Sequence, residues 1–188
     1  MLDVLYDDRA VVVVDKPAGM ATVPSRGGGP SVANETGLLV CHRLDACTSG
    51  CLVLARTAEA QRRLNADFAE GRVAKVYAAV CRGDIPDEGA CDTPLGAWHR
   101  GRVAVGRGRP AWTTWRVRWR RDGLVGVEAR PRTGRTHQVR AHLMVAGAPI
   151  LGDDTYGGRP WNRVMLHAWR VELPGPIRVE APLPEGFA

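Results

Sequence analysis

The chain has 188 residues, a length typical of one domain, and 45% of them are hydrophobic, which is enough for a sizeable core. Its 26 basic and 20 acidic residues give a formal charge of +6, and a pI of about 9.5 is typical of proteins that bind nucleic acid. The apolar runs, residues 10–14 among them, are all far shorter than the roughly 20 residues that cross a membrane, and no secretory signal is visible, so we expect a cytoplasmic protein without a membrane span.

Nearly all of the positive charge is arginine, since only Lys16 and Lys75 are lysines. Arginine suits bidentate phosphate contacts and stacking on bases. A biased genomic base composition is at least as good an explanation of the excess, although it does not explain the clustering of arginines in residues 100–121. There a solvated strand face and an RNA contact surface are about equally good interpretations.

The five cysteines have no Cys-x-x-Cys pair, so we interpret them as reduced, small apolar residues and expect no metal site. The six tryptophans are interpreted as core or hairpin packing rather than as a stacking platform for bases.

In chain order, three apolar runs of the first half predict strands: residues 10–14, 51–55 and 73–81. The first ends in a turn at residues 15–19, and residues 24–30, with three consecutive glycines, predict a mobile loop. Between the second and third runs, Thr57 is a candidate N-cap of a helix with apolar residues at a spacing of four, and Gly71 is its candidate C-cap.

In the second half, residues 115–120 alternate apolar and arginine side chains, and Asp122-Gly123 separates them from a second strand-like run, residues 124–127, which predicts a hairpin. Residues 139–146 predict a short helix closed by Gly147. Many short strands with two clear helices predict an α+β fold, a mixed and largely antiparallel sheet flanked by helices. No linker is visible, so we expect residues 1–188 to form a single domain.

The most informative segment is His42-Arg43-Leu44-Asp45-Ala46-Cys47-Thr48-Ser49-Gly50. A carboxylate is seldom buried without a partner, and an acid between a basic pair and a turn is a candidate nucleophile or general base. The structural alternative is a capping or turn acid.

Two further segments carry candidate chemistry. Tyr77, in the predicted strand 73–81, is by itself best explained as core, and its functional use would be to stack on a planar base. Residues 134–143 open a helix with Gly-Arg-Thr, an anion-binding arrangement. His137 and His142 lie five residues apart, the wrong spacing for a zinc helix, and for His142 we favour a structural role.

These segments, in this order, resemble the RluA-type RNA pseudouridine synthases. That family's His-Arg-Leu-Asp-x-x-Thr-Ser-Gly matches residues 42–50, and its Gly-Arg-Thr/Ser-His-Gln-x-Arg-x-His matches residues 134–142. The supporting segments also match: residues 14–19, Lys75 with Tyr77, residues 149–153 and residues 166–168.

The resemblance implies Asp45 as the catalytic aspartate, Arg140 as its arginine partner and Tyr77 as the aromatic face for the target uracil. Leu166 would line the pocket. The remaining implied contacts to substrate or RNA are His42, Arg43, Arg135, His137 and Gln138.

The resemblance also implies the reaction, in which a uridine of ribosomal or transfer RNA is isomerised to pseudouridine after flipping out of its stack. The product is an isomer of the substrate, so no metal and no cofactor are expected. A monomer is expected, without the N-terminal S4 domain of longer members. A non-catalytic RNA-binding or RNA-chaperone module is the alternative, and an intact set of Asp45, Tyr77 and Arg140 argues against it.

Overall fold

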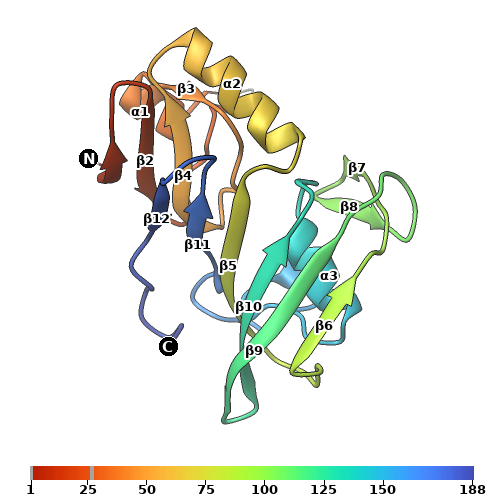
Figure 1. The fold of residues 1–188 in the computed structure, drawn as a ribbon. Helices are drawn as coiled ribbons and strands as arrows, with labels where there is room; N and C mark the ends of the chain where they lie inside the picture. The colour runs from red at the N-terminus through yellow and green to blue at the C-terminus, as the bar shows by residue number, and fades with distance from the viewer. Residues whose placement is uncertain (1, 26–27) are drawn as a thin grey trace. The chain divides into compact units, whose positions relative to one another are not determined.

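A computed structural model describes residues 2–25 and 28–188 of the chain (Figure 1). The chain divides into two compact units. Unit 1 comprises residues 1–75 and 168–182, and unit 2 comprises residues 76–167 and 183–188. The single-domain organisation stays a prediction.

The sheet of unit 1 is built from the strands β1 (Asp3–Asp7), β2 (Val11–Lys16), β4 (Ser49–Ala55) and the part of β11 (Leu166–Glu172) that follows residue 167, in that order. Strand β3 (Leu39–Val40) pairs with β4, and β12 (Arg178–Glu180) pairs with β11. The ladders β1–β2 and β2–β4 are antiparallel, and Lys16 at the end of β2 faces Gly50 at the start of β4.

Two helices belong to unit 1. Helix α2 (Ala58–Ala69) lies beside β3 and β4 (Figure 1), and it starts where Thr57 accepts a hydrogen bond from the backbone N–H of Ala60. Its buried residues Ala60 and Leu64 belong to the core of unit 1. The C-cap of α2 is Glu70 rather than the predicted Gly71, which follows it in the left-handed region. The short helix α1 (Val32–Thr36) is capped by Ser31 and ends at Gly37.

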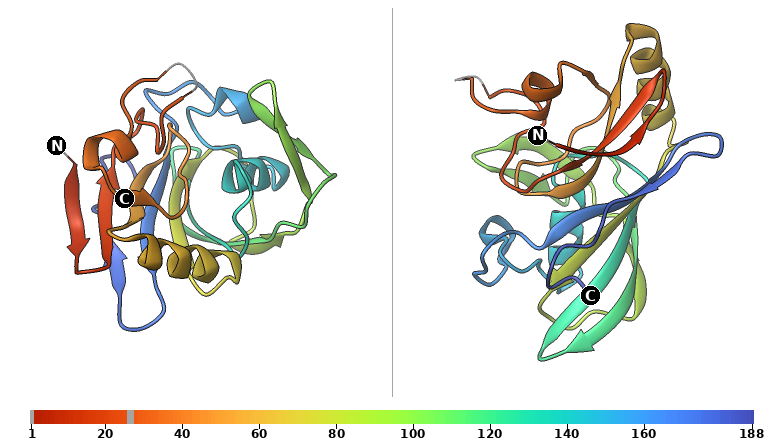
Figure 2. Two further views of the ribbon diagram at one scale, coloured as in Figure 1. Left: turned by 90° about the horizontal axis from the view of Figure 1, so that it is seen from above. Right: turned by 90° about the vertical axis from the view of Figure 1, so that its left-hand side faces the viewer.

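Unit 2 contains the antiparallel strands β5 (Ala74–Cys81), β10 (Leu124–Pro131), β9 (Thr113–Arg121) and β6 (Glu88–Cys91), in that order. Strands β9 and β10 form a long hairpin (Figures 1 and 2). Asp122 and Gly123 both have positive φ angles at its tip, as a two-residue turn that follows the strand twist requires.

Helix α3 (Gln138–Val145) packs on β9 and β10, with the 3₁₀ turn η1 (Asp154–Tyr156) beside it. A second hairpin, β7 (Leu95–His99) and β8 (Arg102–Val105), lies against α3 and η1 through Leu95, Val103 and Tyr156 (Figure 2).

The predicted fold class is confirmed, and so are the three strands, the hairpin at residues 122–123 and the two helices. The predictions missed the helix α1, the β7–β8 hairpin, the 3₁₀ turn η1 and the strands β1, β3, β6, β11 and β12. The tryptophan prediction holds for Trp115, which is buried, and is wrong for Trp98 and Trp161, which are more than half exposed.

None of the five cysteines forms a disulfide in the structure, and burial raises the pKa of Cys41 to about 11 and that of Cys51 to about 12. Residues 26 and 27 of the predicted loop 24–30 lie outside the described residues. Within the described ranges, every helix is too short or too polar for a transmembrane span.

Candidate active site

Asp45 lies in unit 1, in the loop that joins β3 to β4, and it is partly exposed. Its carbonyl oxygen accepts a hydrogen bond of 3.0 Å from the backbone N–H of Thr48, so Asp45 is the first residue of a β-turn. Aspartate is common at this position of turns, which is the structural alternative raised above. The surroundings of the loop decide between the two interpretations.

A fully buried lysine holds the loop immediately after Asp45. The Nζ of Lys16 donates to the carbonyl oxygens of Pro17 at 2.9 Å, Met20 at 2.7 Å and Ala46 at 3.2 Å. The backbone N–H of Gly19 donates to the same Ala46 oxygen at 2.8 Å. One ammonium therefore joins the end of β2, the turn at residues 17–20 and the Asp45 loop.

The residue immediately before Asp45 is fixed as well. Thr22 donates its hydroxyl to the carbonyl oxygen of Leu44 at 2.8 Å and accepts from the N–H of Leu44 at 3.1 Å. Both residues are buried. Asp45 thus lies between two anchored neighbours, and an ordinary surface turn has no need of a buried ammonium to hold it. This arrangement favours a preorganised carboxylate over a turn acid.

His42 has a structural partner rather than an open face. The pairing of β3 with β4 ends at Val40, which faces Leu54. The next residue of β4, Val53, donates its backbone N–H to the Nε2 of His42 at 3.0 Å. The ring lies 4.4 Å from that of Phe68. Burial and the nearby Lys75 ammonium lower the pKa of His42 to about 3, so the imidazole is neutral and serves as an acceptor. We assign His42 to the support of the loop, while Arg43 is exposed and its contact with RNA stays a prediction.

In unit 2, Arg140 projects from the first turn of α3 into a buried ion pair. Its Nε donates to one carboxylate oxygen of Asp153 at 2.7 Å, and its Nη2 donates to the other at 2.8 Å. Both side chains are nearly inaccessible, with exposed fractions of 6% and 0%. Asp153 is not among the site residues predicted from the sequence. The pairing of Arg140 with Asp45 stays a prediction.

Tyr156 supports the same arginine. The Arg140 guanidinium carbon lies 5.2 Å from the centre of the Tyr156 ring. The phenol oxygen accepts from the N–H of Val103 at 3.1 Å and lies 3.0 Å from the Nδ1 of His137. His137 caps α3 in the left-handed region, with φ 55°, which is uncommon for a residue other than glycine. Its ring is therefore engaged within unit 2.

Gln138 is a second predicted RNA contact that has an internal role instead. Its Oε1 accepts from the Thr133 hydroxyl at 2.7 Å and from the Arg135 N–H at 3.0 Å. Its Nε2 donates to the Trp112 carbonyl at 2.9 Å and to the Thr113 hydroxyl at 3.0 Å. An amide makes four hydrogen bonds, so this buried side chain has none left for RNA.

His142 has the structural role favoured from the sequence. Its ring is fully buried between the Thr113 hydroxyl and the Thr93 carbonyl, at 2.9 and 3.0 Å.

Tyr77 and Leu166 also lie in unit 2. Tyr77 is partly exposed on β5, opposite Ala129 of β10, and its ring packs at the border of the unit's core. Leu166 is buried in that core. Both placements fit an aromatic face and an apolar lining, and these roles stay predictions.

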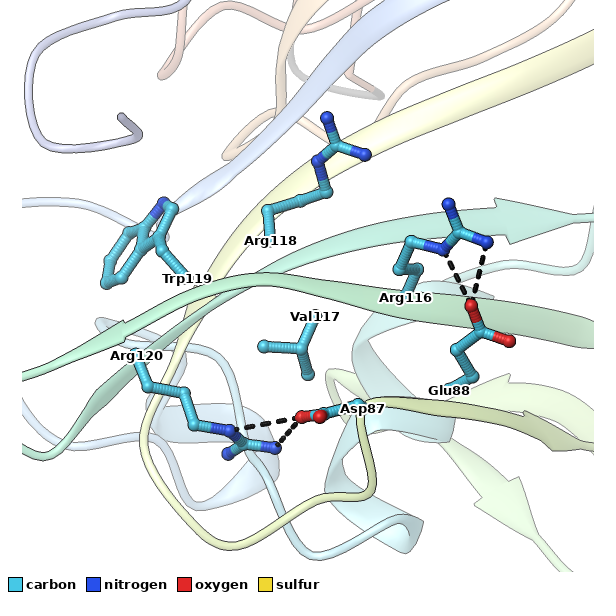
Figure 3. A pocket seen from close by; sticks show the side chains of 7 residues that line it. All are labelled: Asp87, Glu88, Arg116, Val117, Arg118, Trp119 and Arg120. Atoms are coloured by element: carbon cyan, nitrogen blue, oxygen red, sulfur yellow. Dashed lines mark hydrogen bonds and ion pairs between the residues drawn. The ribbon is translucent and has the colours of Figure 1, made fainter.

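The basic residues of unit 2 fall into two groups. On the outer face of β9, Arg116 pairs with Glu88 at 2.7 Å and Arg120 pairs with Asp87 at 2.8 Å, beside a shallow pocket of about 440 Å³ (Figure 3). None of the predicted site residues lines this pocket. These ion pairs favour a solvated strand face for this part of the arginine cluster.

The second group surrounds the tip of the β7–β8 hairpin. Arg100 and Gly101 form a two-residue turn with positive φ angles, and Trp98 beside them is 60% exposed. The exposed arginines of this region are Arg100, Arg102, Arg107 and Arg109. The Nε of Arg135 donates to the carbonyl oxygen of Pro110 at 3.0 Å, next to Arg109 in the chain, and burial and repulsion by Arg109 lower the pKa of Arg135. Such a concentration of positive charge favours an anionic partner.

Among residues 2–25 and 28–188, no cluster of three or more histidine, cysteine or acidic side chains is arranged to hold a metal ion. The chemistry available to the described site residues is that of a carboxylate, a guanidinium and a phenol.

Comparison with known proteins identifies relatives across nearly the whole chain. A model of the family described as RNA pseudouridylate synthase matches residues 10–144. The chain is 39% identical to an uncharacterized RNA pseudouridine synthase of Zymomonas mobilis, over 98% of this chain and 94% of that protein. It is 36% identical to ribosomal large subunit pseudouridine synthase D of Xanthomonas campestris, over 98% of this chain and 66% of the relative.

Solved structures agree with these sequence relatives. Human RNA pseudouridylate synthase domain containing 1 superposes with a TM-score of 0.82 at 28% identity, covering 100% of this chain and 85% of that one. Human RNA pseudouridylate synthase domain containing 4 gives a TM-score of 0.81 at 25% identity, covering 98% and 90%.

Proposed function

The chain belongs to the RluA-type RNA pseudouridine synthases, an isomerase family, and on this premise we propose that it converts a specific uridine of a structured RNA into pseudouridine with Asp45 as the essential carboxylate. The observation that carries the assignment of Asp45 is its loop, which Lys16 and Thr22 anchor on both sides of the acid.

The reaction breaks the bond between N1 and C1′, turns the uracil and rejoins it through C5. A base in a helical stack must first be extruded, at a cost of a few kcal/mol. Contacts between arginines and phosphates supply part of that free energy, and the exposed Arg43 and the β7–β8 arginines are the candidates for them. Stacking on Tyr77 would restore about 1–3 kcal/mol.

A carboxylate in a desolvated pocket stays charged when a guanidinium lies beside it. In the proposed site Arg140 has this role toward Asp45. No metal and no redox step is required by the net reaction, since every atom of the uridine except the C5 hydrogen stays in the product, and a proton from water replaces that hydrogen at N1.

We propose ribosomal RNA as the first substrate to test, because several relatives are named as synthases of the large ribosomal subunit. Transfer RNA is the second. Mapping pseudouridines in total RNA from a strain that lacks this gene, and again after adding the purified protein, identifies the RNA and the uridine.

The role of Asp45 is tested with that RNA after labelling its uridines with tritium at C5, because formation of the new bond releases the label to water. Asp45→Asn is expected to release only background tritium and to bind RNA within about twofold of the wild type. The matched control is Asp122→Asn, since asparagine also tolerates the left-handed turn that Asp122 occupies, and it is expected to turn over normally.

Near-normal release by Asp45→Asn would refute the assignment. A wild-type protein that binds RNA and forms no pseudouridine in any RNA would instead support the non-catalytic binding module.

A further inference from the structure

Arg140 is held in one orientation by groups of its own unit. A guanidinium bound through Nε and Nη2 to both oxygens of one carboxylate cannot rotate about its last side-chain bond without losing both hydrogen bonds. Asp153 is completely buried, so its carboxylate has no freedom to follow such a rotation. The two hydrogen bonds to Asp153 therefore fix the plane of the guanidinium.

The centre of the Tyr156 ring lies 5.2 Å from the guanidinium carbon of Arg140. The ring therefore also limits movement of the guanidinium toward Tyr156. This ring is buried, and its hydroxyl is tied to two other elements, the Val103 N–H of β8 and the His137 imidazole at the start of α3. The phenol accepts from Val103, so its own proton is available for the Nδ1 of His137. Tyr156 is thus held in place through its hydroxyl.

A stability role alone explains this arrangement poorly. Burying an ion pair usually contributes little to folding compared with apolar residues of the same size. A pair that is buried, bidentate and covered by an anchored aromatic ring instead suits a task in which the direction of the donors matters.

We propose that Asp153 and Tyr156 are positioning residues that fix the orientation of Arg140 for the reaction. The inference rests on the proposed function, in which Arg140 is a catalytic residue beside Asp45. The two hydrogen bonds to Asp153 use Nε and Nη2 of Arg140.

The experiment measures the single-turnover rate and the RNA affinity of Asp153→Asn, Tyr156→Phe and Tyr156→Leu. Asp153→Asn retains the shape and loses one oxygen acceptor, and we expect its rate to fall by about tenfold to 100-fold while RNA affinity stays within about twofold. Tyr156→Phe keeps the ring and loses the hydroxyl, so it should be less affected than Tyr156→Leu. The control is Asp154→Asn, an exposed acid one residue away, which should behave as wild type.

A double-variant cycle separates positioning from general structural support. If Asp153 acts through Arg140, Arg140→Met with Asp153→Asn turns over at the rate of Arg140→Met alone. If the losses multiply, or if Asp153→Asn alone has the wild-type rate, the inference is wrong.

A measurement without turnover keeps the inference distinct from the proposed function. The Nε–H of Arg140 is buried and bonded, so its NMR signal should exchange slowly with water in the wild type and rapidly in Asp153→Asn and Tyr156→Leu, with the fold intact by circular dichroism. Unchanged exchange in both variants would overturn the inference even if the protein forms pseudouridine. Slow exchange in a wild type that forms no pseudouridine would instead place the failure in the proposed function.

Discussion

Lys16 gives the sharpest test of how the Asp45 loop is held. Lys16→Met keeps most of the apolar stem and removes the ammonium that serves three carbonyl oxygens. Hydrogen bonds from a charged donor are worth about 1.5–3 kcal/mol each, a gross loss of about 4.5–9 kcal/mol. Removing a buried charge recovers several kcal/mol of desolvation cost. The net destabilisation should then be about 2–4 kcal/mol, which lowers the Tm of a chain of this size by about 4–16 °C.

The same change should slow the reaction more than it weakens RNA binding, because Ala46 adjoins Asp45 and loses one of its two hydrogen bonds. A displacement of about 1 Å at a reacting group costs about 100-fold in rate. Lys16→Arg serves as the second variant. It keeps the charge, but a planar fork does not fit a site made for a compact ammonium, so we expect little rescue.

Thermal unfolding by circular dichroism and single-turnover tritium release measure the two effects. A Tm within about 1 °C of the wild type would refute the stability estimate, since it corresponds to less than about 0.5 kcal/mol. A stable Lys16→Met with a normal rate and reduced RNA affinity would show that Lys16 supports RNA binding rather than the geometry of the loop.

Two further predictions concern unit 1. The pKa of His42 in the folded protein, about 3, lies below its ordinary value of 6.5, so the unfolded chain takes up a proton at a higher pH than the folded chain. The stability that neutral His42 contributes is therefore complete above pH 6.5. It declines by up to about 1.4 kcal/mol per pH unit as the pH falls toward 3. Urea titrations at pH 7 and pH 4.5 should show a smaller loss in His42→Gln than in the wild type, and equal losses would contradict the pKa. Gly50→Ala should express poorly, or its free energy of unfolding should fall by at least about 3 kcal/mol. The added Cβ would lie 2.3 Å from the carbonyl oxygen of Ala168, and Gly50 has a φ of 107°. A soluble variant with the wild-type Tm would contradict this.

Much of the fold could be predicted because its longer elements carry strong local signals. The four valines of β2, the spacing of Ala60 and Leu64 in α2 and the Asp122-Gly123 turn each determine one kind of structure. The missed elements lack such signals. Helix α1 has five residues, too few for a periodic pattern, and the β7–β8 turn is Arg100-Gly101 rather than the asparagine or aspartate with glycine that marks a hairpin.

The candidate site could likewise be predicted only in part. Asp45 could be identified from its motif, whereas the internal roles of His42 and Gln138 could not, because a motif records which residues occur together and not which hydrogen bonds they make. Asp153 did carry a signal: it is an acid that follows an apolar run and a glycine, and the reasoning applied to Asp45 applies to it as well. Lys16, the last residue of the buried strand β2, could have been noticed for the same reason.

The division of the chain between the units has a consequence for biosynthesis. Unit 2 interrupts unit 1 in the sequence, so a ribosome that has completed residue 75 must add 92 more residues before those of β11 and β12 emerge. At about 5–20 residues per second this takes about 5 to 20 seconds. During this interval the backbone at Gly50 and the thiol of Cys51 lack their contacts with residues 168–179. The strand that follows the Asp45 loop is therefore completed late, and chaperones that bind exposed strands would meet the nascent chain at this stage.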